Sequence, residues 1–157
     1  MKKKMIAVLV VLLVVSTASV FALGIGAQSG WSTGFSGALS IVPDGNGLRF
    51  AVNGYLGGVT RVGVTADKWL ANKSLAKPIN YFYGVGAAGD VALGGGLAAG
   101  VYGRLLAGLN CYLLDDFMEI YLQAAWQPGI SIGIGNSLSI TPVISNFPLD
   151  LGVRFWL

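Results

Sequence analysis

The chain has 157 residues, of which 54% are hydrophobic, only 11% are charged and 24 are glycine. This is too apolar and too poorly charged for an ordinary soluble domain, in which about a quarter of residues are charged, and too hydrophobic for a disordered chain. Histidine is absent and cysteine occurs once, which excludes the commonest general base, an intramolecular disulfide and a cysteine-based zinc site. The length favours one domain.

The N-terminal residues have the pattern of a secretory signal peptide. Three lysines at positions 2–4 precede an uninterrupted apolar run from Met5 to Val15, and small and polar residues follow. Val20 and Ala22 suit the −3 and −1 positions of signal peptidase, so we predict cleavage after Ala22. The predicted division is a signal peptide at 1–22 and a single domain at 23–157. An uncleaved anchor is the alternative, but the run is shorter than the roughly 20 residues that span a membrane.

The signal peptide accounts for the positive charge of the chain. Ten Lys and Arg residues stand against seven Asp and Glu, and three of the lysines lie in the predicted leader. The remaining domain is therefore formally neutral, with seven residues of each sign. A nucleic-acid partner would need a basic stripe, so we expect none.

From Leu23 onward the sequence alternates with a period of two, which is typical of β-strands. At the C-terminus, Leu151, Val153 and Phe155 share one parity while Gly152 and Arg154 share the other. Turn-forming residues at 43–47 and 114–116 separate several of the alternating stretches. We expect eight strands, at about 23–31, 33–42, 48–57, 59–70, 79–91, 96–113, 117–128 and 148–157.

The charged residues indicate which face of the strands is enclosed. All four arginines lie on the less apolar parity of their strands, together with four carboxylates, and the domain has a single Glu, whereas a soluble surface carries many Lys and Glu. This favours a polar interior with paired charges and an apolar exterior facing lipid. The predicted fold is all-β: an eight-stranded antiparallel up-and-down transmembrane β-barrel, too narrow for an open metabolite pore. The predicted lumenal network comprises Arg49, Arg61, Asp67, Asp90, Arg104, Glu119, Asp150 and Arg154.

The connections and the aromatic residues extend this prediction. With both termini in the periplasm, the connections at 43–47, 71–78 and 114–116 are periplasmic, and those near 31–33 and at 57–58, 91–95 and 129–147 face outward. The uncharged stretch 127–148 contains the longest outward loop and is the candidate binding surface for an unknown ligand. Aromatic residues near strand ends are either interfacial girdle residues or ordinary packed side chains: Trp31, Trp69, Tyr81, Tyr83 and Trp126.

Several stretches carry a resemblance to known proteins: 81–86 (YFYGVG), 103–112, 119–122 (EIYL) and the closing 152–157 (GVRFWL). The chain resembles the small eight-stranded outer-membrane barrels of OmpA and OmpX type. More closely, it resembles small spirochaete-type outer-membrane barrel proteins, most of them without an assigned function. The resemblance implies a bacterial outer-membrane location, lipid as a partner, and a barrel assembly machinery that reads the last strand. The residues implied in that signal are Val153, Phe155, Trp156 and Leu157, where the usual terminal aromatic is replaced by leucine.

Two patterns invite a catalytic or cofactor interpretation. Residues 84–89 match GxGxxG, but a dinucleotide site needs a helix there and the following glycine-rich sequence does not favour one, so close-packed barrel glycines are the better interpretation. Arg104, Glu119, Asp150 and Arg154 could form a catalytic or ion-binding cluster, but paired lumenal charges explain them more simply. We predict no catalytic, cofactor-binding or metal-binding residues.

The sequence therefore favours an envelope structural or surface-interaction protein that acts through its outward loops. One alternative is a secreted or periplasmic soluble β-barrel that binds an apolar ligand with its apolar parity turned inward. Another is an α-helical membrane protein, because residues 120–149 carry no charge, but Pro128, Pro142 and Pro148 oppose a helix there. An enzyme is the least favoured class.

Overall fold

The computed structural model describes residues 23–30, 36–42, 47–55, 59–94, 96–135 and 137–157. The predicted signal peptide at 1–22, Trp31 and the turn at 57–58 lie outside these residues. None of the described residues belongs to a helix long and apolar enough to cross a membrane. The described strands are β1 (Gly24–Gly30), β2 (Ser36–Val42), β3 (Leu48–Tyr55), β4 (Thr60–Ala76), β5 (Ile79–Leu93), β6 (Leu97–Leu113), β7 (Met118–Trp126), β8 (Gly129–Ile134), β9 (Leu138–Val143) and β10 (Leu149–Trp156).

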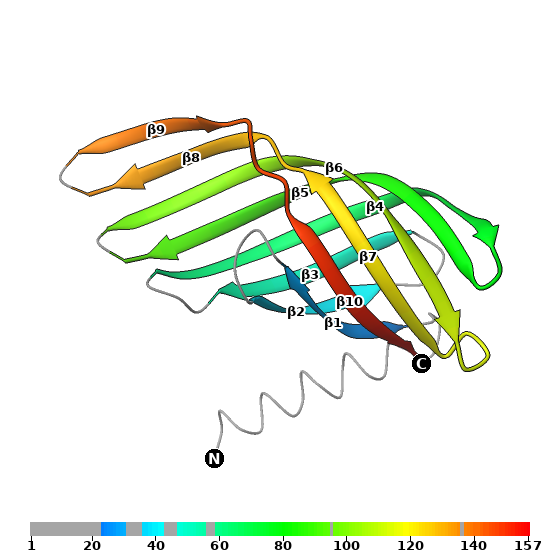
Figure 1. Ribbon diagram of the computed structural model, residues 1–157. Coiled ribbons are helices and arrows are strands. Elements are labelled where there is room, and N and C mark those ends of the chain that lie inside the picture. Colours follow the sequence, from blue (N-terminus) through cyan, green and yellow to red (C-terminus); the bar gives the residue numbers. More distant parts are fainter. Residues whose placement is uncertain (1–22, 31–35, 43–46, 56–58, 95, 136) are drawn as a thin grey trace, which may run out of the picture.

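The strands form one antiparallel sheet that closes on itself through the pairing of β5 with β6 (Figure 1). β7 and β8 both pair with the same side of β6, in one continuous register that is interrupted only at 127–128. They therefore act as one wall strand. β9 and β10 likewise follow each other along β8 and β7, with a shift of one residue in register across 144–148. When β7 and β8 are counted as one strand, and β9 and β10 as another, the described strands form an eight-stranded up-and-down barrel.

The barrel has two different ends, which we name by the chain termini. At the proximal end, Leu23 and Leu157 are hydrogen-bonded to each other, and Trp156 N–H donates to the carbonyl of Phe117 in the β6–β7 turn. The β4–β5 hairpin also turns at this end. At the distal end, the β8–β9 hairpin and the tips of β5 and β6 project beyond the short strands β1 to β3 (Figure 1).

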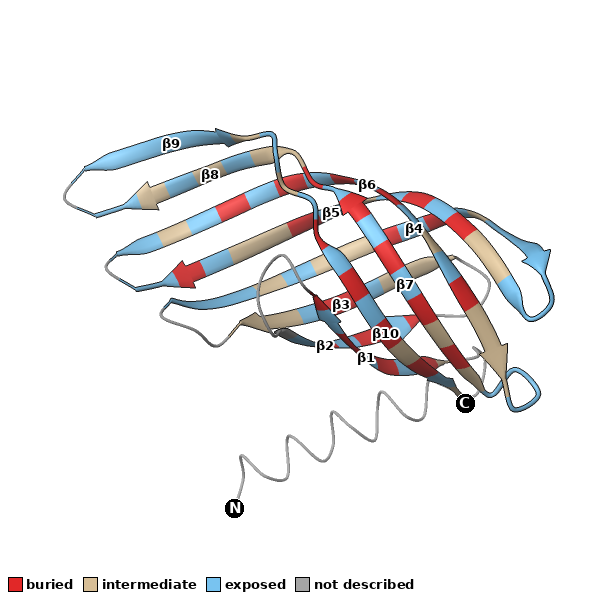
Figure 2. Ribbon diagram, in the orientation of Figure 1, coloured by how far each residue is buried: buried red, intermediate tan, exposed pale blue. Residues whose placement is uncertain are grey.

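Burial along the strands is inverted relative to a soluble protein. Alternate residues of β6, β7 and β10 are buried and exposed (Figure 2). The buried side includes Glu119 at 0% and Arg154 at 1% exposure, whereas the large aliphatic side chains of the other parity face out, with Val101 72% exposed. Water-soluble folds do the opposite. The apolar parity therefore points outward, which contradicts the soluble alternative that needed it inward.

Two predicted connections are wrong. The stretch 71–78, expected to be a long turn, mostly continues β4, which reaches Ala76, so that only 77–78 remain as the turn before β5 at Ile79. The expected loop at 129–147 contains the β8–β9 hairpin, whose sequence alternates Ile130, Ile132 and Ile134 with smaller residues. Elsewhere the expected strands agree with the structure within a few residues at their ends.

Inward-facing glycines make room for the large side chains of neighbouring strands. Gly152 lies opposite Tyr121, and a Cβ atom on Gly152 would overlap the Cζ atom of Tyr121. Gly108 lies opposite Phe82, and its added Cβ would overlap the Phe82 ring. These two inward glycines therefore make room for aromatic side chains in a narrow interior. The GxGxxG stretch lies inside β5, where no helix begins.

Candidate functional site: the barrel interior

The buried charges near the proximal end form a compact cluster. Arg154 on β10 and Glu119 on β7 are cross-strand neighbours, with Arg154 Nη1 2.5 Å from Glu119 Oε2. Asn110 donates a hydrogen bond of 2.7 Å to the other carboxylate oxygen, and Arg154 Nη2 donates to Ser40 Oγ at 3.2 Å. Charge-assisted hydrogen bonds of this kind are among the strongest in proteins. This arrangement offsets the cost of burying both charges.

An aromatic stack lies beside this cluster. The rings of Trp69 and Phe82 are parallel within 7°, with centroids 3.5 Å apart, and both side chains are buried inside the barrel. The Arg49 guanidinium lies 3.2 Å from the centroid of the Trp69 ring and donates to the carbonyl of Gly47 at 3.4 Å. The expectation that Trp69 could belong to an interfacial girdle is therefore wrong, because its parity is inward. Tyr83 and Trp126 do face outward, 48% and 39% exposed.

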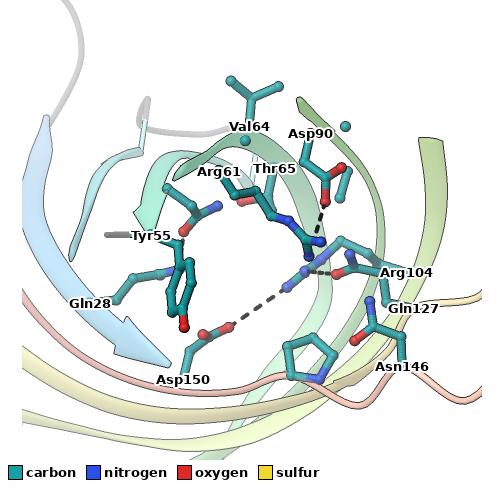
Figure 3. Close-up of a pocket in the computed structure, with 15 residues that line it drawn as sticks. Gln28, Tyr55, Arg61, Val64, Thr65, Asp90, Arg104, Gln127, Asn146 and Asp150 are labelled. Carbon is teal, nitrogen blue, oxygen red and sulfur yellow. Dashed lines mark hydrogen bonds and ion pairs between the residues drawn. The ribbon is translucent and has the colours of Figure 1, made fainter. Parts of the chain in front are cut away.

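A second charged cluster lies toward the distal end, around Arg104 (Figure 3). Arg104 Nε donates to Asp67 Oδ1 at 2.9 Å, and its Nη1 donates to Gln127 Oε1. Its Nη2 lies 4.0 Å from Asp150 Oδ2, a distance suited to a weaker ion pair. Gln123 also approaches Asp67, at 3.5 Å. One arginine thus links β4, β6 and β10 across the lumen.

A small polar cavity opens above Arg104. Its volume is about 80 Å³, room for several water molecules, and Figure 3 shows Gln28, Tyr55 and Arg61 around it. Arg61 lies 3.8 Å from Asp90, and its side chain is 48% exposed, so this ion pair is at the mouth of the barrel. Below the cavity, the buried side chains of the two charged clusters occupy the lumen. Such an interior can hold water and paired charges.

The predicted lumenal residues fall into three groups. Asp67, Arg104 and Asp150 meet in the distal cluster, Glu119 and Arg154 pair in the proximal cluster, and Arg61 and Asp90 pair at the mouth. Arg49 stands apart: within the described residues no carboxylate lies within salt-bridge distance, and its partner is the Trp69 ring. No group of His, Cys, Asp and Glu in the described residues could hold a metal ion.

The prediction omitted the neutral polar residues that complete both clusters. Gln28 accepts a hydrogen bond of 2.7 Å from the Tyr121 hydroxyl and donates one of 3.3 Å to Asn53. These residues lie on the inward parity of their strands, a signal that a search restricted to ionisable groups overlooks. The other omitted residues are Ser40, Asn110, Gln123 and Gln127.

Comparisons with known proteins agree with this architecture. No protein-family model matches the sequence, and no curated protein matches it. The fold is similar to the crystal structure of a major outer membrane protein from Thermus thermophilus, with a TM-score of 0.51 and 15% identity over 87% of this chain and 99% of that chain. The crystal structure of Neisserial surface protein A (NspA) also matches, with a TM-score of 0.47 and 18% identity over 86% of this chain and 94% of that chain. The predicted fold class, a small barrel of the outer-membrane type, is confirmed.

Proposed function

We propose that the chain is an outer-membrane β-barrel with a side-chain-filled interior, which acts as a structural component of the envelope. The observation that carries this proposal is the inverted burial: a charged, hydrogen-bonded interior surrounded by exposed aliphatic side chains. That surface is stable only where lipid, not water, covers it. The clusters around Arg104 and Arg154 fill the lumen and would support the wall without an open metabolite pore.

Export and assembly fit the same proposal. The predicted signal peptide at 1–22 would bring the chain across the inner membrane, and the barrel assembly machinery would then read the last strand. The proposed signal residues alternate on β10: Phe155 and Leu157 are exposed, Val153 is half-buried, and Trp156 has the opposite parity. We propose no catalytic role, since the sequence has no histidine and the buried charges engage one another.

Beyond this structural role, we propose that the protein binds a surface ligand, and the β8–β9 hairpin favours this role. This hairpin projects at the distal end, and β9 pairs with β8 but with no second strand among those described. An unpaired strand edge is a template for another chain. Leu138 and Ile140 on β9 are 68% and 65% exposed. An unknown surface ligand would therefore meet residues 127–148, the stretch that the sequence singles out.

A labelling experiment tests whether this hairpin faces outward. In a Cys111→Ala background, Ser137→Cys places a thiol at the tip of the β8–β9 hairpin, and Asp115→Cys places one in the β6–β7 turn at the opposite end. On intact cells, a membrane-impermeant maleimide should label position 137 and leave position 115 at background. After the outer membrane is permeabilised, both positions should react. The reverse pattern on intact cells would mean that the distal end faces the periplasm.

A further inference from the structure

The lysines outside the predicted leader gather on one hairpin. Lys68 and Lys73 lie on β4 and Lys77 lies in the turn to β5, so all three belong to the hairpin that turns at the proximal end (Figure 1). All three are exposed. The hairpin extends past β3, whose pairing with β4 ends at Lys68. It therefore carries positive charge at and beyond the end of β3.

A β-bulge puts the lysines of β4 on the same face. Lys68 and Lys73 have opposite parity in the sequence, so a regular strand would turn one of them toward the lumen. The register shifts between Trp69 and Ala71, and as a result Lys68 lies opposite Val85 while Lys73 lies opposite Tyr81. Val85 and Tyr81 share the outward parity of β5. The residue before Lys73 confirms the change of face, because Asn72 donates to the inward Tyr112 hydroxyl at 3.3 Å.

The lysine patch adjoins the apolar exterior and contains no carboxylate. Its outward neighbours include Leu70 and Leu75, which are 56% and 63% exposed, and the tyrosines at 81 and 83. From Lys68 to Gly89 the sequence has no Asp or Glu, and Asp67 is buried against Arg104. The exposed Asp115 and Asp116 lie in the separate β6–β7 turn. The positive charge of the patch is therefore not neutralised on its own hairpin.

We propose that Lys68, Lys73 and Lys77 bind the phosphate groups of anionic phospholipids in the membrane leaflet at the proximal end. This inference rests on the proposed membrane location. Lysine stems can lie along apolar surface while their ammonium groups reach the headgroup level, and tyrosines occupy the same interface. Juxtamembrane lysines are attracted to anionic lipid surfaces. The bulge after Trp69 is the structural device that turns Lys73 to the lipid side of the wall.

Lipid selectivity measures this interaction directly. Protein purified from membranes is reconstituted in vesicles of phosphatidylcholine mixed with phosphatidylglycerol, and native mass spectrometry counts the lipids of each kind that it retains. The native chain should retain phosphatidylglycerol preferentially, and each Lys→Gln substitution at 68, 73 or 77 should lower that preference roughly five-fold at low salt. The matched Lys68→Arg/Lys73→Arg/Lys77→Arg variant keeps the charge and should keep the preference. Raising the salt concentration should weaken the native preference.

The possible results distinguish a failure of lipid binding from a failure of the proposed membrane location. Each variant is first checked for an intact barrel by its mobility shift on boiling in dodecyl sulfate. If a combined Lys68→Gln/Lys73→Gln/Lys77→Gln variant is an intact barrel and retains phosphatidylglycerol as the native chain does, the lysines do not bind lipid phosphate and the inference is wrong. If the native chain does not insert into these vesicles, the membrane location itself fails, and this inference fails with it.

Discussion

Replacing Glu119 with leucine is expected to lower the free energy of unfolding of the barrel by about 3–5 kcal/mol, the usual cost of breaking a buried ion pair. The substitution leaves Arg154, which is 1% exposed, without its carboxylate partner, and it removes the acceptor of the Asn110 hydrogen bond. Urea unfolding in detergent micelles, followed by tryptophan fluorescence, should show a clearly lower midpoint. An unchanged midpoint would contradict the assignment of this cluster to the stability of the interior.

A double variant distinguishes the lost ion pair from a simple packing defect. Glu119→Leu/Arg154→Leu removes both charges, so no unpaired charge remains from this pair. Buried pairs can often be replaced by apolar residues at little cost, so this variant should be more stable than Glu119→Leu alone. If the second substitution only adds to the loss, the two side chains do not act as a pair.

Replacing Gly152 with valine is expected to destabilise the barrel by about 3 kcal/mol, at the upper end of the usual cost of overpacking. The added Cβ would meet the ring of Tyr121, which is 2% exposed and is held by its hydrogen bond to Gln28. Valine otherwise favours strands, so any loss must come from this contact. The same urea titration measures the effect.

Gly103→Val is the matched control for this substitution. Gly103 also lies in a strand, but it faces outward and an added Cβ there would have nothing within 4 Å. Valine at this position should be neutral or stabilising, because glycine weakens a strand interior. If both valine variants lose stability equally, the inward glycines are not needed to accommodate the large lumenal side chains.

Much of the fold could be predicted from the period-two pattern, because strands with one lumenal and one lipid-facing side display their two environments in alternate residues. The β8–β9 hairpin escapes this prediction although Ile130, Ile132 and Ile134 alternate with smaller residues. Its strands are short, and Pro142 lies within β9. The bulge after Trp69 leaves no mark in the sequence, since a register shift depends on the pairing partner. Because the two sides of β4 exchange parity at the bulge, the alternation does not reveal that the strand continues to Ala76.

The interior site was only partly predictable. The alternation along each strand predicts that the arginines lie inside the barrel, but it does not predict which residues they contact. Arg104 meets Asp67 and Asp150 because of the register and stagger of three different strands, which no local pattern specifies. Arg49 illustrates the limit most clearly: parity predicts a paired lumenal charge, yet its contact is the face of Trp69. Sequence thus predicts which residues share the interior, and the structure is needed to say how they pair.

A barrel with a charged interior and an aliphatic exterior is expected to be folded in the outer membrane. Heat-modifiable gel mobility of a washed outer-membrane fraction tests it most directly, since small barrels resist dodecyl sulfate while folded. The protein should be found in this fraction, and its band should change mobility between unboiled and boiled samples. Release of the protein in soluble form by osmotic shock would rule out the membrane location, because the exposed aliphatic surface would then have to be covered by something other than lipid.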